Sequence, residues 1–465
     1  MAISSINPAN GNVVKRFEEI SEAELEAKMQ LSVQAFAKHR KTSFAQRAEL
    51  MRRAAEILER DKRTYGQMMT EEMGKTLKSA IAEAEKCATA FRYYAEHGEA
   101  FLRDEQVKTD ADQSYIRYLP IGPVLAIMPW NFPFWQVVRF AAPALMAGNV
   151  GLLKHASNVP RCALALEDLI VKAGFVQGAF QTLLLESKHV SRLIDDPRVR
   201  AVTLTGSEGA GVAVGAQAGK QIKKSVLELG GSDPFIVMPS ANLDEAVRTA
   251  VVARNINNGQ SCIAAKRFIV HEKIYAEFEK RFVARLRELK VGDPMREDTD
   301  IGPLASESAR KGIAEQVERS VAAGAKLLVG GKSIDGPGYY YAATALGDIP
   351  EKAPVFRDEV FGPVALLFKV RDIDHAIALA NDSSFGLGSS VWTHDPDERQ
   401  RFIDELEAGM TFVNAMVASD ARLPFGGVKR SGYGRELSTV GLREFVNIKS
   451  VVIHDKAVAQ LPSSE

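Results

Sequence analysis

One cysteine stands in a stretch whose composition suits a reactive nucleophile. Cys262 follows Gly259 and Gln260 in the segment NINNGQSCIAAK, residues 255–266. Glycine lets the backbone turn tightly, so a sulfur placed just after such a turn can face a cleft. The thiolate is a strong nucleophile, although a free thiol has a pKa of about 8.5. The alternative is a buried, inert thiol that packs as a small hydrophobic side chain, and the cysteine alone does not decide between them.

A second candidate for chemistry is Glu228, a lone carboxylate among apolar residues and glycines in VLELGG, residues 226–231. An apolar setting raises the pKa of a carboxyl group, which suits a general base. The alternative is an acid at the end of a strand that accepts hydrogen bonds from backbone amides. Glu228 is therefore a candidate base that needs support from the rest of the chain.

The elements around these residues are typical of a parallel sheet built from βαβ units. Helical periodicity covers residues 21–102 and returns at 140–147 and 161–173. Strands are expected at 124–128, 150–153, 180–184, 199–204 and 225–229. Polar residues stand at four strand ends, namely Asn131, residues 154–157, Ser207 and Glu228. Ligands bind beyond the carboxyl ends of such strands, so we expect one dinucleotide cleft there, although the usual G-x-G-x-x-G fingerprint is absent.

A second α/β unit is expected after Gly231. Its predicted elements are a helix at 243–254, the Cys262 turn, a strand at 267–270 and a helix at 274–289, with further alternation to about residue 413. A glycine-rich loop at 424–434 and a short strand at 451–453 follow, and residues 114–118 alternate as in a strand. A chain of 465 residues is long enough for two or three domains.

Composition narrows the class of protein. Lys plus Arg and Asp plus Glu are both 59, so nothing points to nucleic acid or to an acidic membrane surface. Residues 121–138 carry no charge, but Pro129 and Pro133 would interrupt a membrane-spanning helix. The three cysteines are odd in number and far apart, and no signal segment is seen at the N-terminus, so a cytoplasmic protein is expected. No Cys/His spacing suggests a metal site.

Five motifs in this order resemble the NAD(P)-dependent aldehyde dehydrogenase superfamily. They are PWNFP at 129–133, VLELGG at 226–231, NNGQSC at 257–262, EVFGP at 359–363 and PFGGVKRSG at 424–432. Together they span nearly the whole chain, and DARLPFGG at 420–427 looks most like the succinate-semialdehyde dehydrogenases. The resemblance implies an α/β fold with a Rossmann-type parallel-sheet cofactor domain, an α/β catalytic domain and a small β oligomerisation arm.

The resemblance also implies where the domains of this chain begin and end. Residues 1–110 and 125–231 would form the cofactor-binding domain and 232–416 the catalytic domain. Residues 111–124 and 440–460 would form the arm, through which the family makes dimers and tetramers, and 417–439 a loop at the substrate entrance. We therefore expect a homo-oligomer.

In the family, Cys262 would attack the aldehyde carbon. The Asn131 side chain and the cysteine amide would stabilise the oxyanion, hydride would pass to the nicotinamide, and Glu228 would activate water to hydrolyse the thioester. By position, the cofactor-binding residues would be Trp130, Lys154, His155, Ala156, Ser157, Gly206, Ser207, Leu229, Glu359 and Phe361. Ser207 suits a helix cap as well.

The cofactor is expected to be NADP rather than NAD, although NAD remains possible. Relatives that prefer NAD often carry a glutamate at the position of Ser157, and a carboxylate there would bind the ribose 2′-OH and repel a 2′-phosphate. Ser157 is uncharged and can donate a hydrogen bond to phosphate, and Lys154 supplies positive charge nearby. The alternative is that Ser157 only caps a turn and both cofactors are used.

The predicted reaction is the oxidation of succinate semialdehyde to succinate. Arg139 would bind the distal carboxylate, with Ser419 and Arg422 as further candidates, while a buried structural arginine and a loop cap are the alternatives. An amino-aldehyde or general aliphatic aldehyde dehydrogenase is the rival within the family. A cysteine hydrolase is a more distant rival, because none of the eight histidines lies in a motif that suggests a base.

Overall fold

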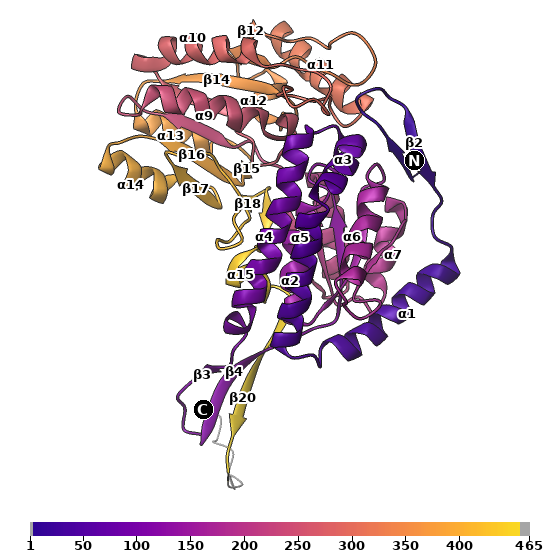
Figure 1. Cartoon of the computed structure of the whole chain (residues 1–465). Coiled ribbons are helices and arrows are strands. Elements are labelled where there is room, and N and C mark those ends of the chain that lie inside the picture. The colour runs from indigo at the N-terminus through magenta and orange to yellow at the C-terminus, as the bar shows by residue number, and fades with distance from the viewer. Residues whose placement is uncertain (1–2, 456–465) are drawn as a thin grey trace.

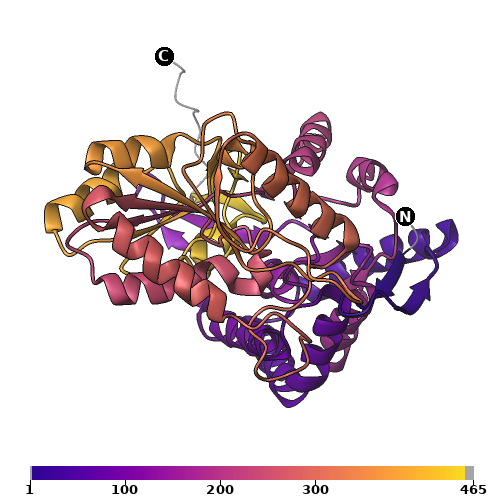
Figure 2. The same ribbon diagram turned by 90° about the horizontal axis from the view of Figure 1, so that it is seen from above.

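The fold consists of two α/β units and a protruding β arm (Figure 1). The structure is a computed structural model and describes residues 3–455. One unit is built on a six-stranded sheet and the other on a seven-stranded sheet. The seven-stranded unit lies above the six-stranded one in Figure 1, and Figure 2 looks down on the larger sheet and the helices that cover it. None of the described helices is long and apolar enough to cross a membrane.

The six-stranded sheet has the order β19-β9-β8-β5-β6-β7, and its first five strands in the chain are parallel. Its strands are β5 (Pro123–Met128), β6 (Val150–His155), β7 (Phe180–Thr182), β8 (Ala201–Thr205), β9 (Lys224–Glu228) and the antiparallel β19 (Gly432–Tyr433). The connecting helices are α5 (Trp135–Ala147), α6 (Pro160–Lys172), the short η1 (Ser187–His189), α7 (Val190–Asp195) and α8 (Glu208–Lys220). The βαβ architecture predicted from the alternating pattern is confirmed.

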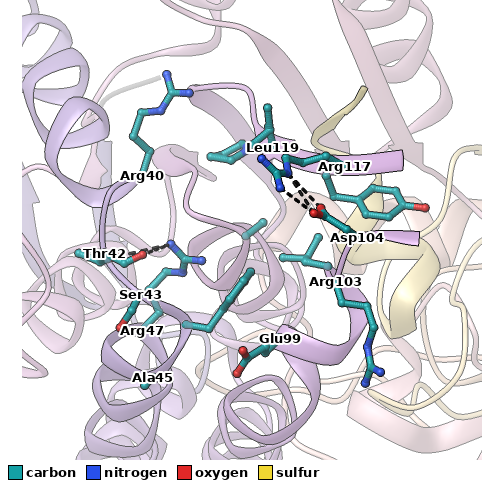
Figure 3. A pocket seen from close by; sticks show the side chains of 15 residues that line it. Arg40, Thr42, Ser43, Ala45, Arg47, Glu99, Arg103, Asp104, Arg117 and Leu119 are labelled. Atoms are coloured by element: carbon teal, nitrogen blue, oxygen red, sulfur yellow. Dashed lines mark hydrogen bonds and ion pairs between the residues drawn. The ribbon is translucent and has the colours of Figure 1, made fainter. Parts of the chain in front are cut away.

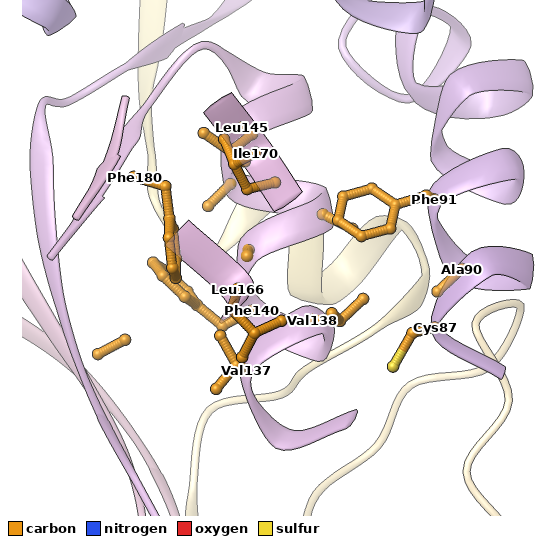
Figure 4. Close-up of a cluster of buried hydrophobic side chains, with 14 of the residues drawn as sticks. Cys87, Ala90, Phe91, Val137, Val138, Phe140, Leu145, Leu166, Ile170 and Phe180 are labelled. Atoms are coloured by element: carbon orange, nitrogen blue, oxygen red, sulfur yellow. The ribbon is translucent and has the colours of Figure 1, made fainter. Parts of the chain in front are cut away.

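The N-terminal part adds a hairpin and four helices to this unit. These elements are β1 (Ile3–Ile6), β2 (Val13–Phe17), α1 (Glu22–His39), α2 (Phe44–Arg60), α3 (Lys62–Met73) and α4 (Leu77–Phe101). Ser21 caps α1 in a reciprocal capping box with Glu24, which satisfies amides that the helix itself leaves unpaired. In the core between α4, α5 and α6, Phe91, Phe140 and Ile170 pack with the fully buried thiol of Cys87 (Figure 4).

The seven-stranded sheet has the order β12-β13-β14-β11-β10-β16-β17, and only β12 runs antiparallel to its neighbour. Its strands are β10 (Pro234–Val237), β11 (Arg267–His271), β12 (Lys326–Val329), β13 (Thr344–Gly347), β14 (Val364–Val370), β16 (Gly388–Trp392) and β17 (Met410–Val413). Its helices are α9 (Leu243–Asn255), the short η2 (Ile256–Gly259), α10 (Glu272–Glu288), α11 (Glu307–Ala322), α12 (Pro354–Arg357), α13 (Ile373–Asn381) and α14 (Pro396–Glu405). A small ladder pairs β15 (Phe385–Gly386) with β18 (Val428–Lys429).

The arm is formed by β3 (Glu105–Gln106), β4 (Gln113–Pro120) and β20 (Val446–Ile453), which follows α15 (Ser438–Arg443). β4 and β20 are paired over their full length although they lie far apart in the sequence (Figure 1). The end of the predicted arm segment 440–460 lies outside the described residues.

Three boundaries differ from those expected. β5 begins at Pro123, inside the segment assigned to the arm. Residues 417–439 are not only an entrance loop, since β18 and β19 within them pair with β15 and β9. α5 begins at Trp135 rather than near residue 140, because the carboxylate of Glu83 on α4 accepts hydrogen bonds from the amides of Phe134 and Trp135 at 2.8 and 2.9 Å. This cap comes from a distant helix, so local sequence does not reveal it.

Candidate active site

The backbone before Cys262 is wound in an unusual way. Asn257, Asn258 and Gly259 are three successive residues with positive φ, at 56°, 59° and 75°. Such residues are costly unless their surroundings fix them, and asparagine and glycine tolerate this region best. A Cβ at Gly259 would lie 2.4 Å from the carbonyl carbon of Gly362, so only glycine fits against the EVFGP segment. The turn therefore locks the cysteine motif onto the motif at 359–363.

The two asparagine side chains hold this turn in place. Asn257 Nδ2 donates to the carbonyl oxygens of Asn131 and Gln260, at 2.7 and 3.0 Å. Asn258 Nδ2 donates to the carbonyl oxygens of Gly74 and Pro303, at 2.9 and 3.0 Å. The Cys262 turn is thus bonded both to the PWNFP loop and to the segment after α3.

Asn131 and Cys262, the residues expected to stabilise the oxyanion, line the same cavity. Asn131 is buried, and its Nδ2 donates to the Gln260 carbonyl oxygen at 3.1 Å, which leaves its second N–H for a ligand. Gln136 Nε2 donates to the Asn131 Oδ1 at 3.4 Å and so fixes which end of the amide carries the donors. Within residues 3–455, no hydrogen bond occupies the Cys262 amide. The second N–H of Asn131 and the Cys262 amide are therefore both available to a ligand in this cavity.

Cys262 lies where two cavities meet. One, of about 300 Å³, is lined by Trp130, Gly206, Ser207 and Leu229 from the unit of the six-stranded sheet and by Glu359 and Phe361 from the segment before β14. The other, of about 180 Å³, is lined by Lys86, Phe132, Trp135, Arg139, Ser419 and Phe425. Cys262, which is partly exposed, and Gln136 line both. A reaction at the sulfur can therefore take one reactant from each side.

The first cavity fits a dinucleotide. Gly206 and Ser207 line it at the N-terminus of α8, where Ser207 Oγ accepts a hydrogen bond from the Ala210 amide at 3.4 Å. The predicted helix cap is thus confirmed. The unpaired amides and dipole of a helix N-terminus favour an anionic group such as a pyrophosphate.

Six of the ten predicted cofactor residues line this cavity, and Lys154, His155, Ala156 and Ser157 at the end of β6 do not. Lys154 Nζ donates to Ser187 Oγ at 3.2 Å, and its charge faces Glu186 and Glu19. Burial lowers the pKa of Lys154. Ser157 is half-buried, and its backbone carbonyl oxygen accepts a hydrogen bond from the Ser4 amide at 3.1 Å.

The side chain of His155 points into the interior rather than towards a cofactor. Its Nε2 lies 2.9 Å from the carbonyl oxygen of Pro133, and its Nδ1 accepts from the Ala156 amide at 2.9 Å. Burial lowers the pKa of His155 to about 4, so the ring is neutral at pH 7, and its Nδ1 also lies 3.1 Å from the carbonyl oxygen of Met128. His155 therefore ties the PWNFP loop to β6, and it adds no positive charge at a 2′-phosphate.

Glu228 ends β9 but its carboxyl group lines neither cavity. It lies against Gly426, where an added Cβ would be 2.5 Å from Oε1. Neither oxygen has a hydrogen-bond partner within the described part of the chain, and burial together with the nearby Glu436 raises its pKa well above the usual range. Its surroundings therefore favour the neutral acid, and the carboxyl group must rotate away from Gly426 to reach either cavity.

The thiol of Cys262 is also in its neutral form. Burial raises its pKa to about 11, while the positive charges of Arg139 and Lys266 act in the opposite direction. Lys266 is fully buried, and its Nζ donates to the carbonyl oxygens of Ser261 and Cys262. Its charge also lies 3.7 Å from Glu359 Oε1.

Only two of the three predicted substrate-binding residues lie at the second cavity. Arg139 and Ser419 line the second cavity, but Arg139 is buried with its Nε 2.7 Å from Glu436 Oε2 and its guanidinium 4.3 Å from the centre of the Phe425 ring. Arg422 does not enter the cavity. Its side chain is exposed and bound to Asp420 two residues earlier, with Nη2 2.6 Å from Oδ2. A local ion pair thus holds Arg422 on the surface.

Sequence reasoning missed Lys86, Trp135 and Lys266. Lys86 belongs to α4, within the residues 21–102 for which the sequence predicted only helices. Lys266 closes the very segment that contains Cys262, and its contact with the cysteine carbonyl could have been sought at that spacing. Lys86 has no motif around it, so only the fold reveals it.

A further cavity of about 630 Å³ lies at the base of the arm, away from the motifs (Figure 3). Among the charged side chains of its wall, Arg117 forms an ion pair with Asp104, and Arg47 donates to the Thr42 carbonyl oxygen. It contains none of the predicted catalytic residues, so we place no chemistry there.

Comparison with known proteins agrees with this geometry. The model of the aldehyde dehydrogenase family matches residues 1–451. The chain is 58% identical over 457 residues to the NADP(+) succinate-semialdehyde dehydrogenase of Mycobacterium avium (strain 104), with 97% of each chain covered. It is 55% identical over 453 residues to a probable NADP(+) succinate-semialdehyde dehydrogenase of Synechocystis, covering 97% of this chain and 100% of that one.

A crystal structure of succinic semialdehyde dehydrogenase from Streptococcus pyogenes in complex with NADP+ is similar with a TM-score of 0.95 at 36% identity, covering 98% of this chain and 100% of that one. The family match spans nearly the whole length and includes the cysteine, asparagine and glutamate motifs. This chain belongs to the aldehyde dehydrogenase family.

Proposed function

We propose that this protein oxidises succinate semialdehyde to succinate with NADP+ as the hydride acceptor. The observation that carries the proposal is the position of Cys262 at the junction of two cavities, one shaped for a dinucleotide and one with cationic side chains. The names of the relatives at 58% and 55% identity, and of the NADP+-bound structural neighbour, support the same reaction. The net reaction is RCHO + NADP+ + H2O → RCOO− + NADPH + 2 H+.

The residues of this chain would act in sequence at one carbon atom. The Cys262 sulfur attacks the aldehyde carbon as its proton leaves, and a thiohemiacetal forms. The Asn131 side chain and the Cys262 amide donate hydrogen bonds to the developing oxyanion, and one such donor contributes about 3–4 kcal/mol in comparable sites. Bound NADP+ supplies the acceptor of the hydride. Glu228, once its carboxyl group rotates and loses its proton, activates the water that hydrolyses the thioester.

The preference for NADP+ is supported by the end of β6. Ser157 offers a hydroxyl and no negative charge, and Lys154 lies three residues before it with its side chain close to Ser187. A glutamate at position 157 would instead bind a free 2′-OH and repel a phosphate. Lys154 alone supplies positive charge from this segment, because His155 is neutral and faces the interior.

The rival activities fit the site less well. An amino-aldehyde would bring a positive charge to a cavity lined by Lys86 and Arg139, which is unfavourable. A cysteine hydrolase would need a base beside the sulfur, and no histidine is found among the described residues that line either cavity.

The test is kcat/KM for succinate semialdehyde, butanal and 4-aminobutanal, each with NADP+ and with NAD+. We expect succinate semialdehyde with NADP+ to be the best pair. A higher value for butanal or 4-aminobutanal would refute the substrate. Cys262→Ala should abolish oxidation while still binding NADP+, as measured by quenching of tryptophan fluorescence. Ester hydrolysis without cofactor at the rate of aldehyde oxidation would favour the hydrolase instead.

The proposal extends to assembly and location. β20 is the edge strand of the arm, and Ile448, Val452 and Ile453 on it are exposed apolar side chains. An exposed apolar edge is a typical site of pairing with another chain, so we propose a homo-oligomer joined through the arm. The three cysteines are free thiols, which suits a cytoplasmic location. Light scattering of the native protein tests the oligomer, and a monomer would contradict it.

A further inference from the structure

A buried ion pair lies beside the loop that carries Asn131. Lys75 follows α3 and Glu83 lies on α4, and both side chains are excluded from solvent. The Lys75 ammonium group donates to Glu83 Oε2, and it lies 4.1 Å from the centre of the Phe132 ring. The pair is thus in direct contact with the PWNFP loop.

The other oxygen of Glu83 fixes the point at which α5 begins. Oε1 accepts hydrogen bonds from the amides of Phe134 and Trp135 at 2.8 and 2.9 Å, and the residue at the N-cap position, Phe134, makes no side-chain cap of its own. The first turn of α5 also carries Gln136, whose Nε2 donates to Asn131 Oδ1 at 3.4 Å. A shift of this helix end would therefore move the side chain that orients Asn131.

The same pair is linked to the turn that precedes the nucleophile. Lys75 comes directly after Gly74, whose carbonyl oxygen accepts from Asn258 Nδ2 at 2.9 Å. Asn257, the neighbour of Asn258, donates from its Nδ2 to the Asn131 carbonyl oxygen at 2.7 Å. The contacts therefore form a closed ring, which runs from the cysteine turn through the ion pair to the PWNFP loop and back to the turn.

Stability alone does not account for this ion pair. Taking two charges out of water costs free energy, and apolar side chains of similar volume at both positions are often as stable or more so. An apolar side chain, however, could not accept hydrogen bonds from the two amides at the start of α5. Lys75 binds the second oxygen of Glu83 and so fixes the direction in which the carboxylate faces.

We propose that Lys75 and Glu83 are positioning residues, which set the place of the Asn131 side chain relative to the Cys262 turn and so the strength of the oxyanion site. This inference rests on the proposed function, in which Asn131 donates to the oxyanion. Glu83 acts through the start of α5, and Lys75 acts through Glu83. A misplaced donor slows the chemical steps and leaves the pyrophosphate site at the start of α8 intact.

Two double variants separate the acceptor oxygen from the charges. Lys75→Met/Glu83→Gln removes both charges and keeps an oxygen that the two amides can use, whereas Lys75→Met/Glu83→Met removes the charges and the oxygen. Lys62→Met/Glu85→Met is the matched control, because it removes an exposed ion pair between α3 and α4. The measured quantities are Kd for NADP+ and the rate of NADPH formation in a single turnover, with enzyme in excess over succinate semialdehyde or butanal.

The double variant with Glu83→Met should form NADPH about 10- to 100-fold more slowly than wild type, which is part of the loss expected when an oxyanion donor is removed. Both aldehydes should be slowed by the same factor, since each forms its oxyanion at the aldehyde carbon. Kd for NADP+, and the rates of the Glu83→Gln double variant and of the control, should stay within about threefold of wild type. In an Asn131→Ala background the Glu83→Met double variant should add less than about threefold, because the donor that it misplaces is already gone.

Four results would overturn the inference. Equal rates in the two Glu83 variants, whether fast or slow, would show that the acceptor oxygen does not matter. A loss that multiplies with that of Asn131→Ala would show that Glu83 does not act through Asn131. A Glu83→Gln double variant about tenfold slower than wild type would contradict the proposal even if the Glu83→Met variant did not fold. An Asn131→Ala enzyme with the wild-type rate would refute the oxyanion role itself.

Failure of the proposed substrate is a separate result. A wild type that oxidises butanal but not succinate semialdehyde would refute that substrate, while the comparison of variants with butanal would still test the positioning role of the ion pair.

Discussion

The Nζ of Lys266 donates to the carbonyl oxygen of Cys262 across 2.5 Å, at the base of the turn that carries the nucleophile. The same ammonium group lies 3.7 Å from Glu359, which lines the cofactor cavity and whose Oε1 accepts from the Gly231 amide at 3.0 Å. One buried lysine therefore contacts both the Cys262 backbone and Glu359, which lines the larger of the two cavities at Cys262. Its charge lowers the pKa of Cys262 against the larger effect of burial.

Replacing Lys266 with methionine should raise the pKa of the Cys262 thiol above its present value of about 11. The substitution removes one of the two positive charges that stabilise the thiolate, while the effect of burial stays the same. Alkylation by iodoacetamide requires the thiolate, so its rate at pH 8 should fall about three- to tenfold. In the wild type the rate should rise steadily with pH and reach no plateau below about pH 9.

Lys273→Met, at an exposed position of α10, is the control for the loss of one charge. A Lys266→Met enzyme that is alkylated as fast as wild type, with an unchanged melting temperature, would show that Lys266 supports only the backbone.

Glu228→Gln should slow thioester hydrolysis more than hydride transfer. Glutamine cannot take a proton from water, but it keeps the size of the side chain in the space beside Gly426. Mixing the variant with succinate semialdehyde and NADP+ should give a burst of NADPH followed by turnover at least about 100-fold slower than wild type. If the burst and the steady state slow by the same factor, Glu228 is not the deacylation base.

Ser157→Glu should shift the cofactor preference from NADP+ towards NAD+. A carboxylate at this position would accept hydrogen bonds from a 2′-OH and repel a 2′-phosphate, and Lys154 would then neutralise it. The ratio of kcat/KM for NADP+ to that for NAD+ should fall by at least about tenfold. Ser187→Ala tests the neighbouring hydroxyl bonded to Lys154. A wild type that already prefers NAD+, or an unchanged ratio in Ser157→Glu, would contradict this reading of the 2′ position.

Arg139→Met should destabilise the fold as well as the site. The substitution leaves Glu436 buried without the cation 2.7 Å away, and removing one partner of a buried pair typically costs about 3–5 kcal/mol. The double variant with Glu436→Met should recover most of that loss in urea unfolding, because no buried charge is then unmatched. Equal unfolding free energies for Arg139→Met and wild type would mean that the pair does not stabilise the protein.

The family and the α/β class could be recognised from the sequence, and the reacting groups could be predicted from it. Alternating short strands and helices predicted the parallel sheet, because side-chain periodicity is a local property. Local sequence also allowed us to predict the cysteine, asparagine and glutamate motifs and the helix cap at Ser207, since each depends on a few adjacent residues. Strand ends could be predicted to meet because parallel strands place their carboxyl ends at one edge.

The tertiary structure alone decided which charges are free and which are matched. Arg139 and Lys86 are separated by 53 residues in the chain (139 − 86) yet line one cavity, and only their partners distinguish them: Glu436 comes from the far end of the sequence, and no acid pairs with Lys86 within residues 3–455. The inward turn of His155 and the local pairing of Arg422 with Asp420 were settled in the same way. The sequence shows which side chains can carry a charge. The role of each charge depends on how deeply it is buried and on the opposite charges that long-range packing places beside it.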